Sequence, residues 1–340
     1  MAPEKVQNRS MDLSICILTH NLPVLLSQCV TSCVNEIERA GLSGEIIVID
    51  NASSDRYPEK LAASTPTVRI IRNDENLGFA VANNRAVKIS RGENVLILND
   101  DAILQEGSLG LMMSALKSDP RVAAAGPTLV FPDGSPQLMY MKRRLPNLRG
   151  MVAEITGRDL RWKDRPWTRK WLTTWESPEH VAEPEQLSGA CLLVRREAWD
   201  EMGGFDEQFY HVLDDTDLCF RLRKAGWQFR CVEAARVTHY GGFTIVRWDQ
   251  LELRRNYYKC INAYFRKHYS LPRYLLARVV LGLAVVFIFA EATLYGTVHL
   301  ARSGRKVSLS ELTQKARGRL ALLWSLLRVG TVRGPQTSRH

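Results

Sequence analysis

The sequence lacks the glycine-rich signatures of two large classes of nucleotide-binding protein. It contains neither a GxGxxG nor a GxxxxGK[ST] pattern, so neither that kind of dinucleotide site nor a P-loop is predicted. Its seven cysteines are scattered and include no CxxC pair, which argues against a small disulfide scaffold and favours reduced, buried thiols. Residues 1–11 lack the apolar core of a signal peptide. We therefore expect a flexible N-terminus and a catalytic body in the cytosol.

Charge is nearly balanced over most of the chain and concentrated at its end. The 340 residues are 45% hydrophobic and 24% charged, which is ordinary globular usage and excludes a disordered chain or a fibre. The net charge is +10, of which residues 270–340 carry +9. A basic segment beside an apolar run favours a membrane surface over nucleic acid as the partner.

The first half of the chain alternates between short apolar runs and helical patterns. The expected strands are residues 13–18, 45–50, 68–71, 94–98 and 122–126, and the expected helices are residues 22–40, 79–90 and 108–118. This alternation predicts an α/β fold of βαβ units with a mostly parallel sheet. Ligands of such sheets bind at the carboxyl ends of the strands. Polar residues that follow a strand are therefore the first candidates for a site.

The regular pattern stops at residue 132 and resumes at residue 186. Residues 132–184 are rich in proline, tryptophan and arginine, and we expect an irregular insertion of the kind that forms a lid or a partner-binding loop. After it, regular structure is expected to resume at residues 186–194, and residues 214–225 read as a helix and residues 229–239 as a strand pair.

Four polar groups could carry chemistry, and each also has a structural explanation. Asn99-Asp100-Asp101 follows a strand and could hold Mg²⁺ or Mn²⁺, or could form a solvated loop or a helix cap. Asp214-Asp215-Thr216-Asp217 could supply a general base or complement a helix dipole. His239 could join a metal site or simply close a strand. Asn76-Leu77-Gly78 could line a nucleotide site or make a turn.

Together, in this order, these groups resemble the inverting glycosyltransferases of family 2, and in particular their rhamnosyltransferase-like branch. The resemblance covers about residues 12–245 and rests on the following motifs: Ser14-Ile15-Cys16-Ile17-Leu18-Thr19-His20-Asn21, Ile47-Val48-Ile49-Asp50-Asn51, Asn76-Leu77-Gly78-Phe79-Ala80 with Asn83-Asn84, Leu98-Asn99-Asp100-Asp101, Ser188-Gly189-Ala190-Cys191, Leu213-Asp214-Asp215-Thr216-Asp217, and His239. It implies a GT-A fold, a Rossmann-like sheet flanked by helices, over residues 12–268.

The resemblance also implies a role for each matching residue. Base and ribose would contact Thr19, Asn21, Asp50 and Asn51, and the nucleotide-sugar pocket would add Asn76, Gly78, Asn83, Asn99 and Asp100. Gly189, Ala190 and Asp214 would line the acceptor or sugar pocket. Asp101 and His239 would hold a divalent metal, Mg²⁺ or Mn²⁺. Asp215 would be the catalytic base of a single displacement.

The expected reaction transfers a sugar from a nucleotide diphosphate to a cell-surface glycan or a lipid-linked saccharide, as in cell wall polysaccharide biosynthesis. Branch resemblance favours L-rhamnose from dTDP-rhamnose, and a UDP-hexose donor is the alternative within the same fold. A catalytically silent carbohydrate- or nucleotide-binding scaffold subunit is the alternative from another class, which the intact set of acids disfavours.

Residues 269–340 are expected to form membrane-associated helices at the cytoplasmic face of the cell membrane. Residues 279–301 would span about 34 Å as a helix, enough for a hydrocarbon core of about 30 Å. Burying the charge of Glu291 near the centre of a bilayer would cost free energy. The sequence therefore leaves four alternatives open: a span, a re-entrant hairpin, an interfacial helix and a buried soluble helix. Residues 309–329 add a basic, leucine-rich stretch suited to an anionic surface. Because this charge interleaves with apolar residues, nucleic-acid binding is disfavoured.

Overall fold

The computed structural model describes residues 11–55, 57–65, 67–137, 144–155, 184–210, 212–241 and 250–303. The chain forms two compact units, Met1–Leu145 with Ser177–Thr244, and Pro146–Glu176 with Ile245–His340. The second unit thus begins earlier than the boundary at residue 269 that we expected, because the helix that ends at His268 packs on the C-terminal helix. Residues 1–10, 138–143, 156–183 and 309–329, which include most of the expected insertion, lie outside the described residues.

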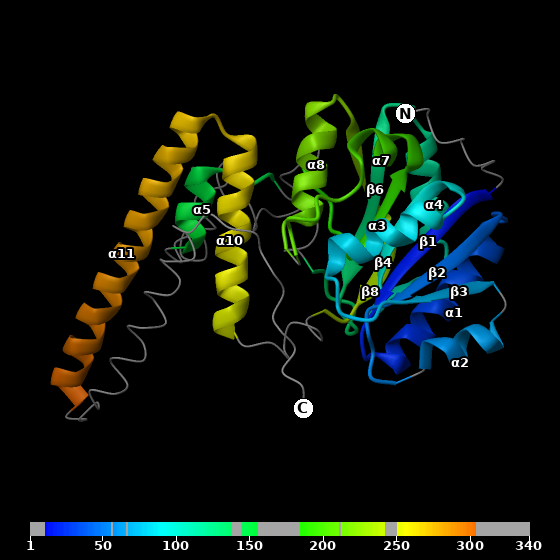
Figure 1. Ribbon diagram of the computed structural model, residues 1–340, viewed down its shortest axis with the longest axis horizontal. Coiled ribbons are helices and arrows are strands. Elements are labelled where there is room, and N and C mark those ends of the chain that lie inside the picture. The colour runs from blue at the N-terminus through cyan, green and yellow to red at the C-terminus, as the bar shows by residue number, and fades with distance from the viewer. Residues whose placement is uncertain are drawn as a thin grey trace. The chain divides into compact units, whose positions relative to one another are not determined.

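The first unit is built on an eight-stranded sheet with the order β3-β2-β1-β4-β7-β6-β8-β5 (Figure 1). The strands are β1 (Met11–Thr19), β2 (Gly44–Asp50), β3 (Val68–Arg72), β4 (Gly92–Asn99), β5 (Ala102–Leu104), β6 (Val122–Val130), β7 (Cys191–Arg195) and β8 (Gln228–His239). β1 lies parallel to both β2 and β4, and β2 lies parallel to β3. The four strands expected from residues 13 to 98 therefore form one parallel half-sheet.

The other half of the sheet keeps the expected mostly parallel arrangement but reverses two strands: β8 runs parallel to β6, and six of the eight strands share one direction. β7 runs antiparallel to β4 and β6, and β5 runs antiparallel to β8, so the sheet is mixed. A continuously apolar strand such as β7 is buried on both faces in either direction, and its sequence does not reveal the direction. The expected strand pair at residues 229–239 is one strand, β8, whose register against β6 shifts between Pro127 and Thr128.

Helices cover both faces of this sheet. On one face are α1 (Pro23–Arg39), α2 (Tyr57–Ser64) and α4 (Ser108–Lys117), which pack through Leu26, Leu61 and Met112 against one core. On the other are α3 (Phe79–Ile89), α7 (Arg196–Met202) and α8 (Asp214–Lys224), which pack through Ala82, Trp199 and Leu218. Alternate residues of β1 point to opposite cores, with Ile15 and Ile17 in the first and Cys16 in the second. This is the period of two that a strand buried on both faces requires.

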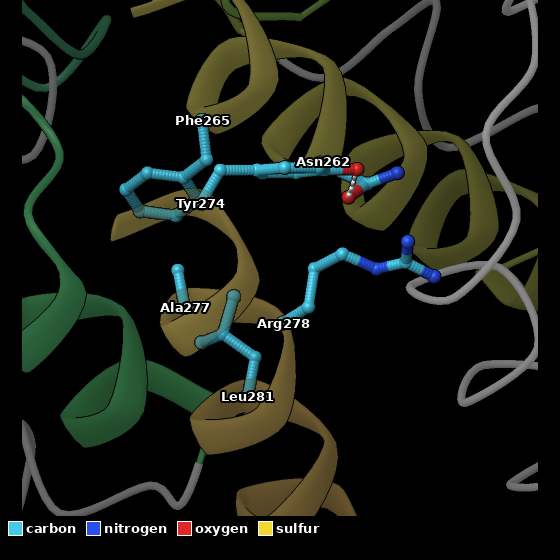
Figure 2. Close-up of a pocket in the computed structure, with 6 residues that line it drawn as sticks. All are labelled: Asn262, Phe265, Tyr274, Ala277, Arg278 and Leu281. Atoms are coloured by element: carbon cyan, nitrogen blue, oxygen red, sulfur yellow. Dashed lines mark hydrogen bonds between the residues drawn. The ribbon is translucent and has the colours of Figure 1, made fainter. Parts of the chain in front are cut away.

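The second unit contains the helices α5 (Leu148–Ile155), α10 (Gln250–His268) and α11 (Leu271–Ser303). α11 packs on α5 and α10. Figure 2 shows a small cavity between α10 and α11, lined by Asn262, Phe265, Tyr274, Ala277, Arg278 and Leu281. The Tyr274 hydroxyl donates a 3.1 Å hydrogen bond to Asn262, which ties the two helices together.

The expected apolar run at residues 279–301 lies on α11. Within the part of the chain that the structure describes, no helix is long and apolar enough to cross a membrane.

Candidate active site

The carboxyl ends of the parallel strands bring the predicted polar residues to one edge of the sheet. Thr19 of β1 lies opposite Asp50 of β2, and Asp50 lies opposite Arg72 of β3. On the other side of β1, Leu18 lies opposite Asn99 of β4. Three strand ends named in the sequence motifs therefore meet where a parallel sheet binds its ligands.

Asp50, at the end of β2, is fully buried and held from two sides. Its Oδ1 accepts a 2.9 Å hydrogen bond from the backbone N–H of Ser53. Arg72 Nη1 lies 2.9 Å from Oδ2, close enough for an ion pair although no aligned hydrogen bond forms there. The carboxylate thus fixes the turn after β2 and couples it to the end of β3.

Asp100, just after β4, turns toward β1. Its Oδ2 accepts a 2.7 Å hydrogen bond from the Thr19 hydroxyl and a weaker one, at 3.4 Å, from the backbone N–H of His20. The pKa of Asp100 is raised to about 7, chiefly by burial and to a smaller extent by the neighbouring Asp101 carboxylate, while the Thr19 hydrogen bond opposes this rise. Asp100 and Asp101 therefore face different parts of the site.

The side chain of Asn51 holds the loop between β3 and α3 in place through hydrogen bonds. Its Oδ1 accepts hydrogen bonds from Asn73 Nδ2 at 2.9 Å and from the Leu77 N–H at 3.1 Å. Its Nδ2 donates to Asn76 Oδ1 at 2.8 Å and to the Gly78 carbonyl at 3.4 Å. These four bonds use the whole capacity of a side-chain amide. Asn51 therefore shapes the proposed nucleotide pocket, and a direct contact with the base would require it to give up one of these bonds.

Three more residues of the expected nucleotide pocket, Asn21, Gly78 and Asn83, belong to the neighbouring loops and to α3. Asn21 has a φ of +57° and accepts a 2.7 Å hydrogen bond from the Ser54 N–H. Gly78 has a φ of +79°, and a Cβ there would come within 2.6 Å of the Tyr210 carbonyl oxygen. Asn83 is buried in α3 and donates to the Phe79 carbonyl of its own helix at 3.0 Å. Its side-chain N–H is thus directed into the helix, whereas Asn21 and Gly78 shape the loops.

Asp101, between β4 and β5, lies close to His239 at the end of β8. The antiparallel pairing sets Ala102 opposite His239, so that Asp101 Oδ1 lies 3.4 Å from His239 Nε2. The other carboxylate oxygen accepts a 3.1 Å hydrogen bond from the Gly241 N–H. Asn99 Nδ2 lies 3.5 Å from the same imidazole nitrogen.

This pair fits the expected divalent metal as a partial ligand set. No cluster of three or more His, Cys, Asp or Glu side chains suited to a metal occurs among the described residues. A carboxylate and an imidazole supply two ligands, and Mg²⁺ and Mn²⁺ sites commonly take the rest from water and substrate phosphates. The residues present therefore suit an ion whose shell is completed by a diphosphate.

Asp214 and Asp215 begin α8 but differ in exposure. Asp214 is buried, its Oδ2 has no hydrogen-bond partner among the described groups, and burial followed by the charge of Asp215 raises its pKa. Asp215 is half-buried, and its Oδ2 accepts a 3.0 Å hydrogen bond from the Gly189 N–H. The residue before them, Leu213, has a φ of +67°, which is unfavourable for a branched side chain. Such local strain is typical of functional sites.

The loop before β7 connects the Asp215 side of the site to Asn99. The Asn99 N–H donates to the Ala190 carbonyl at 3.0 Å, while the neighbouring Gly189 holds Asp215. A Cβ at Gly189 would meet Phe79 and Asp215 at ordinary contact distances. Gly189 and Ala190 thus lie between the proposed base and the end of β4.

Three residues of the site were missed by sequence reasoning. Arg72 could have been found, because it ends the strand beside Asp50. Tyr210 packs over Gly78 and carries no motif. Gln137 hydrogen-bonds His239 from within the irregular stretch that begins at residue 132, where spacing gave no guidance.

Comparison with known proteins agrees with this arrangement. Residues 14–173 match the family model described as Glycosyl transferase family 2, and residues 161–328 match Glycosyl transferase family group 2. An N-acetylglucosaminyl-diphospho-decaprenol L-rhamnosyltransferase of Mycobacterium tuberculosis is 34% identical over 212 residues, which are 57% of this chain and 66% of the relative. The O-antigen biosynthesis protein RfbC of Myxococcus xanthus is 28% identical over 58% of this chain and 15% of its own length.

Solved structures show the same fold at low identity. The mannosyltransferase PcManGT of Pyrobaculum calidifontis, in complex with GDP-Man and Mn²⁺, has a TM-score of 0.55 at 17% identity and covers 94% of this chain and 87% of its own. GalNAc-T7 with UDP, GalNAc and Mn²⁺ has a TM-score of 0.52 at 16% identity, over 67% of this chain and 43% of its own. The mixed sheet is consistent with the expected GT-A fold, and the two family matches together span residues 14–328. Over these two segments the chain is similar to the glycosyl transferases of family 2 and of family group 2.

Proposed function

We propose that this protein is an inverting glycosyltransferase that moves L-rhamnose from dTDP-rhamnose to a lipid-linked saccharide. The observation that carries the proposal is the half-buried Asp215, held by the Gly189 N–H beside the loop that contacts Asn99. This places one accessible carboxylate next to the strand end that carries Asp101. Support for the sugar and the acceptor comes from the Mycobacterium tuberculosis relative, whose name specifies both.

In the proposed reaction, Asp215 accepts the proton of an acceptor hydroxyl. The hydroxyl oxygen then forms a bond to the anomeric carbon as the bond from that carbon to the diphosphate oxygen breaks, and the electron pair leaves with the diphosphate. A single displacement of this kind inverts the anomeric centre and needs no second nucleophile. General-base catalysis of this type contributes about 10²–10⁴-fold in rate.

Asp101 and His239 would hold the divalent cation. When bound, such an ion neutralises the charge that develops on a diphosphate leaving group. The Oδ2 atom of Asp100 instead accepts the Thr19 hydroxyl, on the β1 side of the site. We assign Asp100 to the nucleotide side of the site, with Thr19 and Asp50 fixing the loops that would surround the base and ribose.

We also propose that the second unit binds the cytoplasmic surface of a membrane. α11 buries one face, through Tyr274, Ala277 and Leu281, and exposes an apolar stripe on another. The members of this stripe are each 46–68% exposed: Leu271, Leu275, Leu276, Val279, Leu283, Val286 and Phe287. An exposed apolar stripe in a segment with a net charge of +9 is the combination that anionic lipid surfaces bind. A lipid-linked acceptor would be reached at such a surface.

The proposal is tested by donor hydrolysis and donor binding with Mn²⁺ or Mg²⁺. The panel contains dTDP-rhamnose, UDP-glucose, UDP-galactose and UDP-N-acetylglucosamine, and the wild type is compared with Asp101→Ala and Asp215→Asn. We expect turnover of dTDP-rhamnose that both substitutions abolish. Turnover of a UDP-hexose instead would correct the donor. Neither turnover nor binding across the panel would favour the scaffold subunit over the enzyme.

A further inference from the structure

Gln137 is a buried polar residue that a tight turn returns to the sheet. The chain leaves β6 at Val130 and turns through Asp133 and Gly134. The N–H of Gly134 donates a 2.8 Å hydrogen bond to the Phe131 carbonyl. The Asp133 carboxylate accepts the Ser135 N–H at 2.9 Å, and the Gln137 N–H then donates to the Leu129 carbonyl at 2.9 Å. A Pro-Asp-Gly sequence favours such a turn. It places Gln137 beside the end of β8 with only 1% of its surface exposed.

The hydrogen bonds of the Gln137 amide fix its orientation. Its Nε2 donates to the backbone carbonyl of His239 and, at 3.5 Å, to that of Val130. Its Oε1 lies 2.8 Å from His239 Nδ1. Carbonyl oxygens only accept hydrogen bonds, so the NH₂ group must face the two carbonyls and Oε1 must face the imidazole. Because Oε1 also only accepts, His239 Nδ1 must carry a proton.

The other imidazole nitrogen then has a defined role. With the proton on Nδ1, the neutral ring presents the lone pair of Nε2 toward Asp101 Oδ1, 3.4 Å away. Asn99 Nδ2, at 3.5 Å, is a weak donor to that lone pair. The Gly241 N–H holds the other oxygen of Asp101, so that Oδ1 stays turned to the ring. Two electron-pair donors that face each other suit a cation.

We infer that Gln137 is a positioning residue that keeps His239 in the Nδ1–H tautomer, with Nε2 turned to Asp101 as a metal ligand. The inference rests on the proposed function for the metal, but the tautomer itself is a property of the protein without metal. Gln137 acts through His239 and touches neither the metal nor the substrate. Partners of this kind commonly change metal affinity by 10–100-fold when they are removed.

The direct test is ¹⁵N NMR of the full-length protein labelled at the histidine ring nitrogens, at pH 8 with a chelator. The His239 signals are assigned by their loss in His239→Asn. We expect a pyrrole-type shift for Nδ1 and a pyridine-type shift for Nε2 in the wild type, and loss of this preference in Gln137→Leu. A wild-type spectrum with Nδ1 unprotonated, or with both nitrogens protonated, would overturn the inference.

Mn²⁺ titration gives a second readout. Gln137→Leu should bind Mn²⁺ about 10–100-fold more weakly than the wild type. Gln105→Leu is the matched control, because Gln105 Nε2 donates to the Thr238 hydroxyl at 3.0 Å, one residue from His239, and it should bind Mn²⁺ like the wild type. Equal weakening in both variants would reduce the role of Gln137 to general support of β8 and so contradict the inference.

Gln137→Glu guards against a variant that simply misfolds. In its protonated form the carboxyl group can donate its O–H to the His239 carbonyl and still accept the Nδ1–H, so it should keep the tautomer that Gln137→Leu loses; loss of the tautomer in a folded Gln137→Glu would contradict the inference. The two proposals also fail separately. A wild type that shows the Nδ1–H tautomer but neither binds Mn²⁺ nor hydrolyses any donor would contradict the proposed function and the metal part of the inference, while the positioning of His239 by Gln137 would stand.

Discussion

The hydroxyl of Thr19 donates a 2.7 Å hydrogen bond to Asp100, which joins the carboxyl ends of β1 and β4. Both residues are buried. Burial makes the ionised carboxylate of Asp100 less stable, and the hydrogen bond from Thr19 is the main interaction that offsets this cost. Burial still raises the pKa of Asp100 from its ordinary 3.8 to about 7. The folded protein therefore binds a proton that the unfolded chain has released between these pH values, and its stability falls as the pH rises through this window.

Thr19→Val should sharpen this pH dependence. The substitution removes a donor to a charged acceptor, worth about 1.5–3 kcal/mol, but the full loss appears only where Asp100 is ionised. In chelator, urea unfolding should show a larger loss of stability at pH 8 than at pH 5. Thr31→Val is the control, because the exposed Thr31 hydroxyl donates to a neutral carbonyl of its own helix. Equal losses at both pH values in Thr19→Val would contradict the account.

Asp214→Asn should stabilise the protein at neutral and higher pH. The buried carboxylate has one oxygen without a partner among the described groups, and its pKa is raised by burial and by Asp215. A raised pKa means that its ionisation costs stability as the pH climbs above the ordinary 3.8. An amide of similar shape removes the charge, so we expect a gain on the order of 1 kcal/mol at pH 8 that shrinks toward pH 4. The exposed Asp74→Asn should show no such trend, and a loss of stability in Asp214→Asn at pH 8 would refute the argument.

Gly78→Ala should disturb the nucleotide side of the site. Both Gly78 and Gly41 have a positive φ, but a Cβ at Gly78 would meet Tyr210 at 2.6 Å whereas Gly41 has nothing within 4 Å. Both variants should lose about 1–2 kcal/mol to backbone strain, and Gly78→Ala about 1–3 kcal/mol more to the clash. Thermal unfolding measures the difference, and calorimetry should show weaker donor binding in Gly78→Ala alone. Equal effects in the two variants would mean that the Tyr210 contact is unimportant.

Leu276→Ser combined with Leu283→Ser should weaken membrane binding. The two leucines are 57% and 63% exposed on α11, and their transfer into the lipid interface would supply apolar burial. Co-sedimentation with anionic vesicles should fall by on the order of tenfold. Leu111→Ser, which removes a leucine 42% exposed on α4, serves as the control. Binding should also weaken with salt and resist competition by RNA; vesicle binding unchanged in the double variant would contradict a membrane role for this face.

The polar edge of the sheet was predictable from the sequence because strand ends follow from apolar runs. Asp50 and Asn99 each end a strand whose interior is continuously apolar, and parallel pairing sets them on the same edge. The reversed direction of β7 was not predictable, because a strand buried on both faces reads the same in either direction. Gln137 was hidden for a different reason: its contact with His239 depends on a turn and a pairing across 102 residues of chain, which no local pattern encodes. The exposure difference between Asp214 and Asp215 likewise arises only when α8 packs.

The most direct test of the central claim is transfer of labelled rhamnose from dTDP-rhamnose to a lipid-linked N-acetylglucosamine diphosphate, comparing the wild type with Asp215→Asn in the presence of Mn²⁺. The account predicts product with an inverted anomeric centre from the wild type, a rate lower by about 10²–10⁴-fold in Asp215→Asn, and unchanged donor affinity in that variant. Product with a retained configuration, or a wild-type rate in Asp215→Asn, would contradict it.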